Sequence, residues 1–181
     1  MHSPMNTLPR MQVIRPWRRS DLDAIVRNAD NYAVWRNLRD RFPHPYTPRH
    51  AKDWLASVRD EDPVLNFAIT VNDEAAGGIG IAPGKDVERF SAEVGYWLGE
   101  RFWGRGLATE ALREITTYAF TVVKLHRLYA APFAFNRASV RVLEKAGYRK
   151  EGTLRESAIK EGTVTDQELY AITAPEWRLD P

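Results

Sequence analysis

The stretch Glu93-Val-Gly-Tyr-Trp-Leu-Gly-Glu-Arg101-Phe-Trp-Gly104-Arg-Gly106-Leu-Ala-Thr109-Glu decides the fold. It completes a predicted strand over residues 91–98 and opens a predicted helix over residues 105–123, whose apolar residues recur on one stripe. Free backbone N–H groups and the positive end of the helix dipole meet in the short loop between these elements. Gly104 and Gly106 leave room there for a bulky pyrophosphate. The residues alone leave two interpretations open, an anion site and a glycine-containing turn without a ligand.

Outward from this stretch, the pattern predicts one mixed α/β domain. Strands are expected at residues 12–17, 64–71, 75–82, 91–98, 125–131, 148–160 and 165–173, with hairpin turns at Asn72-Asp73 and Glu161-Gly162. Helices are expected after the capping-box-like Ser20-Asp21-Leu22-Asp23, within residues 30–41, from Thr47-Pro48 onward, and over residues 105–123 and 137–146. The proline-rich segment 42–46 predicts a loop. The expected organisation is a flexible N-terminus at 1–11, a single domain at 12–175 and a tail at 176–181.

The composition is that of an ordinary globular protein, because 44% of the 181 residues are hydrophobic and 28% are charged. The net charge of +2 gives no reason to expect nucleic acid or a membrane surface as a partner. The absence of cysteine excludes a disulfide framework, thiolate metal sites and a cysteine nucleophile. The histidines at positions 2, 44, 50 and 126 lack metal-ligand spacing, so no metal is expected. Without a signal-like or membrane-length apolar run, a cytoplasmic protein is expected.

Two motifs carry a resemblance to a known family. Arg101-Phe-Trp-Gly104-Arg-Gly106 matches the acetyl-CoA loop Gln/Arg-x-x-Gly-x-Gly/Ala of the GCN5-related N-acetyltransferases, the GNAT family. Further on, Asn136-Arg-Ala-Ser139 followed by Gly147-Tyr148 is similar to the second signature, an Asn and a Ser on a helix before a strand that begins Gly-aromatic. Together with residues 91–98, the pattern resembles the RimJ/RimL-like branch and covers residues 13–172.

The resemblance implies an α/β fold with a central mixed, mostly antiparallel sheet, flanked by helices and splayed between two parallel strands at 91–98 and 125–131. Acetyl-CoA would lie in the splay, with backbone amides of residues 104–109 on its pyrophosphate. The implied cofactor-binding residues are Tyr96, Trp97, Leu98, Arg101, Gly104, Arg105, Gly106, Leu107, Ala108, Thr109, Asn136 and Ser139. The alternative for the last two is an N-cap and a polar residue of the first helical turn.

The implied reaction is direct transfer of the acetyl group from acetyl-CoA to an amine in a ternary complex. Glu93, on the strand that would present the thioester, is the expected proton acceptor, directly or through water. Its alternative role is a structural salt bridge, and Glu156 is a second carboxylate to consider. Many relatives use a helix tyrosine for the leaving thiolate, but Leu143 stands at that position. Ser139 is therefore the second expected catalytic residue, as a hydrogen-bond donor to the thiolate.

Asn37, Asp40, Phe42 and Tyr46 are the expected acceptor-binding residues, since aromatic walls and a carboxylate suit a cationic amine. The alternative for Phe42, and the favoured role of Trp54, is packing in the core. The acceptor would be a protein or peptide N-terminus or a small amine such as a polyamine, and a homodimer is common among similar proteins. A non-catalytic acyl-CoA-binding module, favoured by the missing helix tyrosine, is the alternative to an enzyme.

Overall fold

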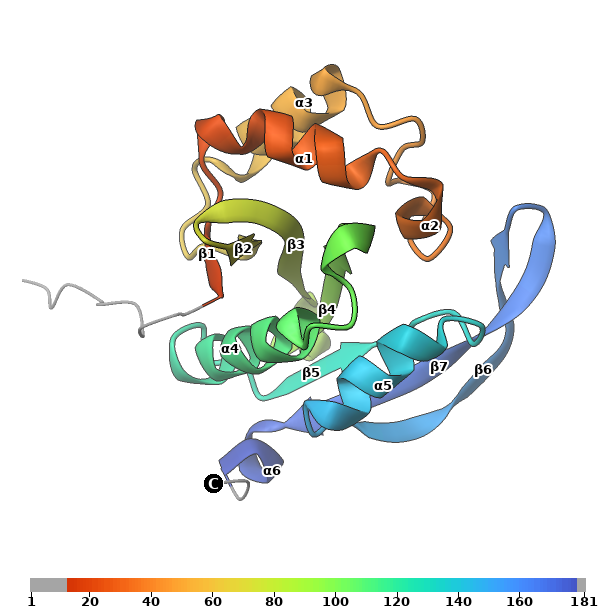
Figure 1. The fold of residues 1–181 in the computed structure, drawn as a ribbon. Coiled ribbons are helices and arrows are strands. Elements are labelled where there is room, and N and C mark those ends of the chain that lie inside the picture. Colours follow the sequence, from red (N-terminus) through yellow and green to blue (C-terminus); the bar gives the residue numbers. More distant parts are fainter. Residues whose placement is uncertain (1–12, 179–181) are drawn as a thin grey trace, which may run out of the picture.

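The computed structural model describes residues 13–178, so the expected flexible N-terminus at 1–11 lies outside the described residues. Its helices and strands follow one another as Figure 1 shows. In chain order these are β1 (Ile14–Pro16), α1 (Leu22–Ala29), α2 (Tyr32–Trp35), α3 (Pro48–Val58), β2 (Asn66–Val71), β3 (Glu74–Pro83), β4 (Ser91–Leu98), α4 (Leu107–Thr121), β5 (Arg127–Ala130), α5 (Arg137–Lys145), β6 (Arg149–Lys160), β7 (Thr163–Thr173) and α6 (Ala174–Arg178). Short 3₁₀ turns occupy Arg19–Asp21, Asp86–Glu88 and Glu100–Phe102.

The strands form one seven-stranded sheet in the order β1-β2-β3-β4-β5-β7-β6. Every neighbouring pair is antiparallel except β4 and β5, which are parallel. Parallel pairing ends early, because β5 matches only Ser91–Glu93 and β4 then continues to Leu98 against β3 alone. The expected mixed, mostly antiparallel sheet that splays between two parallel strands is confirmed.

Helices cover both faces of the sheet, and each face has its own packing cluster (Figure 1). The larger cluster lies under α4 and α5, and α4 buries its expected apolar stripe there, including Leu112, Ile115 and Ala119. The smaller cluster joins α1 and α3 around Ile25 and Ala51. Strand β4 lies between the two clusters, so its alternating side chains face two different environments.

The structure differs in detail from the local sequence predictions. Ser20 does not cap the first helix, because it lies within the 3₁₀ turn Arg19–Asp21 and Asp21 takes the N-cap position. The buried Asp21 carboxylate accepts the Arg18 N–H and the Nη1 and Nη2 groups of Arg15, each at 2.8 Å. The short helix expected within 30–41 is confirmed as the single turn α2, and the Asn37 side chain donates to the Ala33 carbonyl at 2.8 Å at its end. The short α6 covers part of the segment expected as a tail, and Trp177 packs against the larger cluster.

No helix among residues 13–178 combines the length and the apolar character needed to cross a lipid bilayer.

Candidate functional site

The end of β4 presents backbone groups that the sheet does not use. The Gly99 N–H donates to the Ala76 carbonyl at 2.8 Å, so the backbone of Gly99 faces β3. In an antiparallel pair, the backbone groups of successive residues point alternately toward and away from the partner strand. The N–H and C=O groups of Tyr96 and Leu98 therefore point away from β3. No β5 residue pairs with β4 beyond Glu93, within the part of the chain that the structure describes. These groups therefore point into the splay between the two parallel strands.

The loop that follows leads to an exposed helix N-terminus. Gly104 and Gly106 adopt φ values of +75° and +79°, which favour glycine, and nothing lies within 4 Å of a Cβ placed at either residue. Gly106 is the N-cap of the 15-residue α4 and has no side chain that could cap the helix. The N–H groups of the first turn, on Leu107, Ala108 and Thr109, have no acceptor within the helix. Such an end attracts an anion through both its N–H groups and its dipole.

Two side chains of the motif hold this loop in place instead of facing the splay. The Trp103 indole donates to the Leu98 carbonyl at 2.7 Å, so that carbonyl already has a partner. The Arg101 guanidinium donates to Asn28 Oδ1 at 3.2 Å and to Glu74 Oε1 at 2.9 Å, on the side of α1. The side chain predicted to bind the cofactor therefore anchors the loop to the neighbouring helix and strand.

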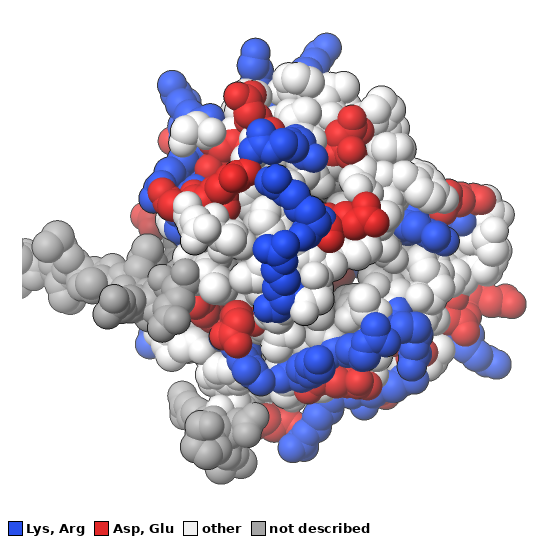
Figure 2. Space-filling view, in the orientation of Figure 1, with Lys and Arg blue, Asp and Glu red and all other residues white. Residues whose placement is uncertain are grey.

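Basic side chains gather around this helix end and along α5. Figure 2 shows a band of Lys and Arg that crosses the face of the molecule over α5. The exposed basic residues of the loop, α4 and α5 are Arg101, Arg105, Arg113, Arg137, Arg141 and Lys145. Their positive charges, together with the α4 dipole, suit a ligand that carries several phosphates.

The start of α5 brings the second motif against β4. The Asn136 side chain accepts the Ser139 N–H at 3.1 Å, so Asn136 is an N-cap as one interpretation expected. The Ser139 hydroxyl lies 2.8 Å from the Tyr96 hydroxyl, which is also 3.2 Å from the Ser139 carbonyl. Ser139 and its N-cap Asn136 thus lie beside the splayed strand.

The contact of the Tyr96 phenol with Ser139 is a feature of this site that the sequence analysis did not predict. The sequence analysis listed Tyr96 only among the cofactor-binding residues. It looked for a tyrosine that assists the leaving thiolate at position 143, on the second-motif helix. Leu143, at the position of the helix tyrosine, is fully buried in the core. Burial raises the pKa of Tyr96 well above its usual value, so this phenol stays protonated at neutral pH. Alternation along β4 places Tyr96 on the same face as Val94 and Leu98, and that signal was available in the sequence.

Glu93 lies on the opposite face of β4. Its carboxylate accepts a hydrogen bond from Arg39 in an ion pair, with 25% of the Glu93 side chain exposed. Trp97, on the same face, contacts Phe42 edge-to-face with 5.6 Å between ring centroids. We call this side of β4, with the segment 36–46 that packs on it, the acceptor face, after the role that the sequence predicted for residues of this segment. Tyr96 and Ser139 lie on the other side of the strand, which we call the cofactor face.

The four predicted acceptor-binding residues all lie in the segment 36–46, but their burial and their hydrogen-bond partners differ. Phe42 and Tyr46 pack together at 5.0 Å between centroids, and Tyr46 is buried, which raises its pKa to about 12. The Asn37 amide bonds to the α2 backbone. The Asp40 carboxylate, 72% exposed, forms an ion pair at 2.8 Å with Lys160. Trp54 packs in the smaller cluster, as the favoured interpretation expected.

The second carboxylate considered, Glu156, lies in an irregular part of β6. The pairing of β6 with β7 shifts register between Leu154 and Ala158, and Glu156 has a positive φ of 52° there. Its N–H donates to Asp166 Oδ1 at 2.7 Å, and the residue is exposed. The structure therefore brings Glu93, but not Glu156, against a residue of the segment 36–46.

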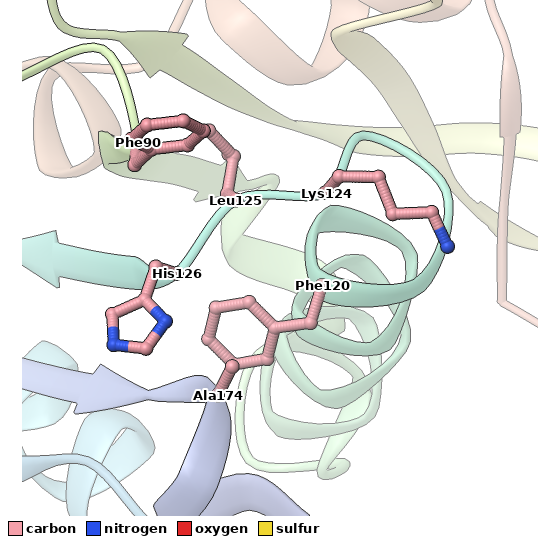
Figure 3. Close-up of a pocket in the computed structure, with 6 residues that line it drawn as sticks. All are labelled: Phe90, Phe120, Lys124, Leu125, His126 and Ala174. Atoms are coloured by element: carbon pink, nitrogen blue, oxygen red, sulfur yellow. The ribbon is translucent and has the colours of Figure 1, made fainter.

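A hollow of about 470 Å³ lies at the other end of the same strands, as Figure 3 shows. It is lined by Phe90, Phe120, Lys124, Leu125, His126 and Ala174. Phe90 precedes β4 and His126 precedes β5, so this hollow lies where the two strands begin and still pair, away from the splay. No three His, Asp or Glu side chains among residues 13–178 converge as metal ligands.

Comparison with known proteins defines the class to which this fold and site belong. Residues 12–149 match the acetyltransferase (GNAT) domain, and the chain belongs to this family of acyltransferases. A Bacillus subtilis protein named "Putative ribosomal N-acetyltransferase YdaF" is 35% identical over 157 residues, which span 86% of this chain and 85% of that protein. "Probable N-acetyltransferase YjcK" of the same species is 42% identical over 86 residues, about half of each chain (48%).

A solved structure supports the same branch. Mycobacterium smegmatis RimJ, in complex with a CoA-disulfide, superposes with a TM-score of 0.78 at 30% identity and covers 90% of this chain and 82% of that one. The predicted fold, the acyltransferase class and the RimJ/RimL-like resemblance are confirmed by these comparisons.

Proposed function

We propose that the chain transfers the acetyl group of acetyl-CoA to a primary amine by direct attack in a ternary complex. The observation that carries this proposal is the splay between β4 and β5, with its free backbone groups next to the exposed N-terminus of α4. A long ligand with a phosphate end and an amide-containing arm is complementary to that arrangement. The relative RimJ, whose structure holds CoA, supports the same ligand class.

Each part of the cofactor face has a task in this proposal. The first-turn N–H groups of α4, with Arg105 and the basic residues of α5, would hold the phosphates. The Tyr96 backbone and the Leu98 N–H would pair with the amides of the pantetheine arm. Bound acetyl-CoA supplies the thioester on which the amine acts. The Ser139 hydroxyl, backed by the protonated Tyr96 phenol at 2.8 Å, would stabilise negative charge on the sulfur.

The acceptor face has the complementary task of preparing the amine. An ammonium group must lose a proton before it can attack, and Glu93 is the carboxylate on the strand that separates the two faces. Glu93 has two carboxylate oxygens and Arg39 contacts one of them, Oε1. The second oxygen, or a water bound to it, would accept the proton.

Two acceptor classes remain in this proposal, an N-terminal amine of a protein or peptide and a small amine. The name of the relative YdaF, a ribosomal N-acetyltransferase, supports the first class for this chain. A ribosomal acceptor also agrees with the expected cytoplasmic location, which we propose with it.

The test is a turnover screen with acetyl-CoA against peptides of varied N-termini, polyamines, amino acids and aminoglycosides. Free thiol release is a clean readout with this chain, because it contains no cysteine that could react with the thiol reagent. Acceptor-dependent thiol release supports the proposal. Tight binding of acetyl-CoA without transfer to any acceptor would contradict it and favour the non-catalytic acyl-CoA-binding module.

A further inference from the structure

Four carboxylates on or beside the acceptor face already have partners within the chain. Asp30 accepts the Tyr46 N–H at 2.9 Å, Asp40 lies 2.8 Å from Lys160, Glu93 pairs with Arg39, and Glu161 accepts the Tyr32 hydroxyl at 2.5 Å. Arg39 and Lys160 offset the charges of Glu93 and Asp40, so an ammonium group of a polyamine would compete with these two cations. The Tyr46 N–H and the Tyr32 hydroxyl are neutral donors and leave the negative charges of Asp30 and Glu161 in place.

Lys160 is the most firmly held of these partners. Only 2% of its side chain is exposed, and its ammonium group lies 3.6 Å from the centroid of the Trp35 ring. The cation–π contact with Trp35 attaches the β6–β7 hairpin to α2, which lies beside it in Figure 1, and the ion pair attaches the hairpin to Asp40 in the segment 36–46. Lys160 is not easily released, because a buried charge that loses its partner is costly.

Arg36 differs from all these groups. Its guanidinium lies 5.8 Å from the centroid of the Tyr32 ring and 5.9 Å from that of Phe135, and the residue is exposed. Among residues 13–178 no carboxylate forms an ion pair with it. The two rings orient the guanidinium while its N–H donors stay available.

The position of Arg36 relates it to both faces of β4. Arg39, three residues further along the same segment, pairs with Glu93 on the acceptor face. Phe135 immediately precedes Asn136, the N-cap that receives the Ser139 N–H on the cofactor face. Arg36 thus lies where the segment 36–46 meets the loop that leads to α5.

We propose that Arg36 determines acceptor specificity by binding a carboxylate that the acceptor carries one or two residues from its reactive amine. This inference rests on the proposed function and names its substrate class, a peptide N-terminus with an acidic residue close behind it. A guanidinium binds a carboxylate through two parallel hydrogen bonds, which gives both direction and affinity. Arg36 and Arg39 belong to one short segment, and Arg39 contacts Glu93, so the proposal places the reactive amine at Glu93 and the acidic side chain one or two residues away at Arg36.

The test measures binding of tetrapeptide amides to the CoA-loaded protein by calorimetry, alongside their acetylation kinetics. The peptides share an N-terminal alanine and carry glutamate, glutamine or lysine at the second or third position, and amidation removes the terminal carboxylate. We expect the glutamate peptide to bind about 3- to 10-fold more tightly than the glutamine peptide, and Arg36→Gln to abolish the difference. The matched control is Arg89→Gln, because Arg89 is also exposed and lies 5.2 Å from an aromatic ring, that of Phe90, at the far tip of β3 and β4.

The outcomes separate this inference from the proposed function. Equal affinities for glutamate and glutamine peptides, tighter binding of the lysine peptide, no binding of any peptide, or a preference that survives Arg36→Gln would each overturn the role of Arg36. Acetylation without a charge preference would overturn that role alone. A charge preference in binding that depends on Arg36, with no acetylation of any peptide, would support the role of Arg36 and contradict the proposed transferase activity.

Discussion

Single residues on β4 divide the proposed chemistry between its two faces. Glu93 and Tyr96 are three positions apart, so their side chains leave the strand on opposite sides. Glu93 meets Arg39 on the acceptor face, whereas the Tyr96 hydroxyl lies 2.8 Å from that of Ser139 on the cofactor face. A proton acceptor and a hydroxyl pair for the leaving sulfur are thereby held on one rigid strand, which fixes their relative position better than a loop would.

Ser139→Ala is expected to lower kcat and kcat/KM together while the affinity for acetyl-CoA stays nearly unchanged. A hydroxyl that helps only as charge builds on sulfur stabilises the transition state more than the ground state. The loss should be about 100-fold or less, because a serine hydrogen-bonds the thiolate and does not fully donate a proton. Tyr96→Phe should lower the same parameters. The rate loss of the double variant should be smaller than the product of the rate losses of the two single variants. Wild-type turnover in Ser139→Ala would show that another group assists the thiolate.

The same hydroxyl pair gives a pH prediction. Burial favours the neutral form of the Tyr96 phenol and raises its pKa above the usual 10, so the hydrogen-bond donor persists as the pH rises. The ratio of wild-type to Tyr96→Phe rates should therefore be constant from neutral pH up to about 10. A ratio that declines between pH 7 and 9 in steady-state kinetics would contradict a buried, protonated donor.

Glu93→Gln is expected to change the pH dependence of kcat/KM with a confirmed acceptor. In the wild type, kcat/KM should rise toward alkaline pH as the amine is deprotonated. At lower pH, Glu93 should accept the proton of the ammonium group and so keep kcat/KM higher than it would be without a base. The amide keeps the size of the side chain but cannot accept the proton, so the rate loss should be largest on the acidic side. A uniform loss at all pH values would instead fit a structural role in the ion pair with Arg39.

At the scale of elements, the sequence predicted structure best where a local signal decides it. Both hairpin turns were predicted from their residue types. In the structure Asn72 and Asp73 have φ values of 50° and 65°, and Gly162 has a φ of 75°, as such turns require. The stripe of α4 and the N-cap of α3 were also local signals. The bounds of α2 were left open and α6 was not predicted, because such short elements depend on side-chain bonds and packing that periodicity does not reveal.

The turn before α4 can be tested with a matched pair of glycine variants. Gly106→Val should destabilise the protein by about 1–2 kcal/mol, because a β-branched residue is strained at positive φ. Gly162→Val imposes the same strain in the β6–β7 turn, where φ is +75° and nothing lies within 4 Å of a Cβ. Only Gly106→Val should weaken acetyl-CoA binding, measured by calorimetry at a temperature where both variants are folded. Equal affinity for acetyl-CoA in the two variants would show that the loop with Gly104 and Gly106 is a structural turn that does not bind the cofactor.

The start of α5 separates a capping role from a binding role. Asn136→Ala should cost about 1 kcal/mol of stability, because Ser139 loses the acceptor for its N–H. Asn136→Asp retains that acceptor and should unfold at nearly the wild-type temperature. If the Asn136 amide also contacts the cofactor, the aspartate variant should bind acetyl-CoA more weakly despite its stability. Unchanged affinity would leave Asn136 as a cap alone.

Across the whole molecule, the candidate site divides into a part that the sequence predicted and a part that it could not. The glycine loop and the α4 N-terminus form one continuous motif, so the sequence predicted the strand–loop–helix arrangement, and the family resemblance supplied the cofactor-binding interpretation. The contacts of Tyr96 with Ser139, of Arg39 with Glu93 and of Asp40 with Lys160 join residues 43, 54 and 120 positions apart. Such pairs depend on how the hairpin and the segment 36–46 fold onto β4, which no local pattern encodes.

Ligand selectivity is a property of the whole molecule, because the proposed cofactor site joins β4, the loop, α4 and α5. A ligand that binds only the folded state stabilises it by about 2.7 kcal/mol at 100 times its Kd. In a domain of this size, that stabilisation corresponds to a rise in Tm of roughly 5–11 °C. CoA and acetyl-CoA should produce such a shift in thermal melts, since their phosphates match the α4 N-terminus and their amides match the splay. ATP and NAD carry phosphates without the pantetheine arm and should shift the Tm little. A comparable shift with ATP would show that the phosphate site acts alone, and the splay would then have no part in choosing the ligand.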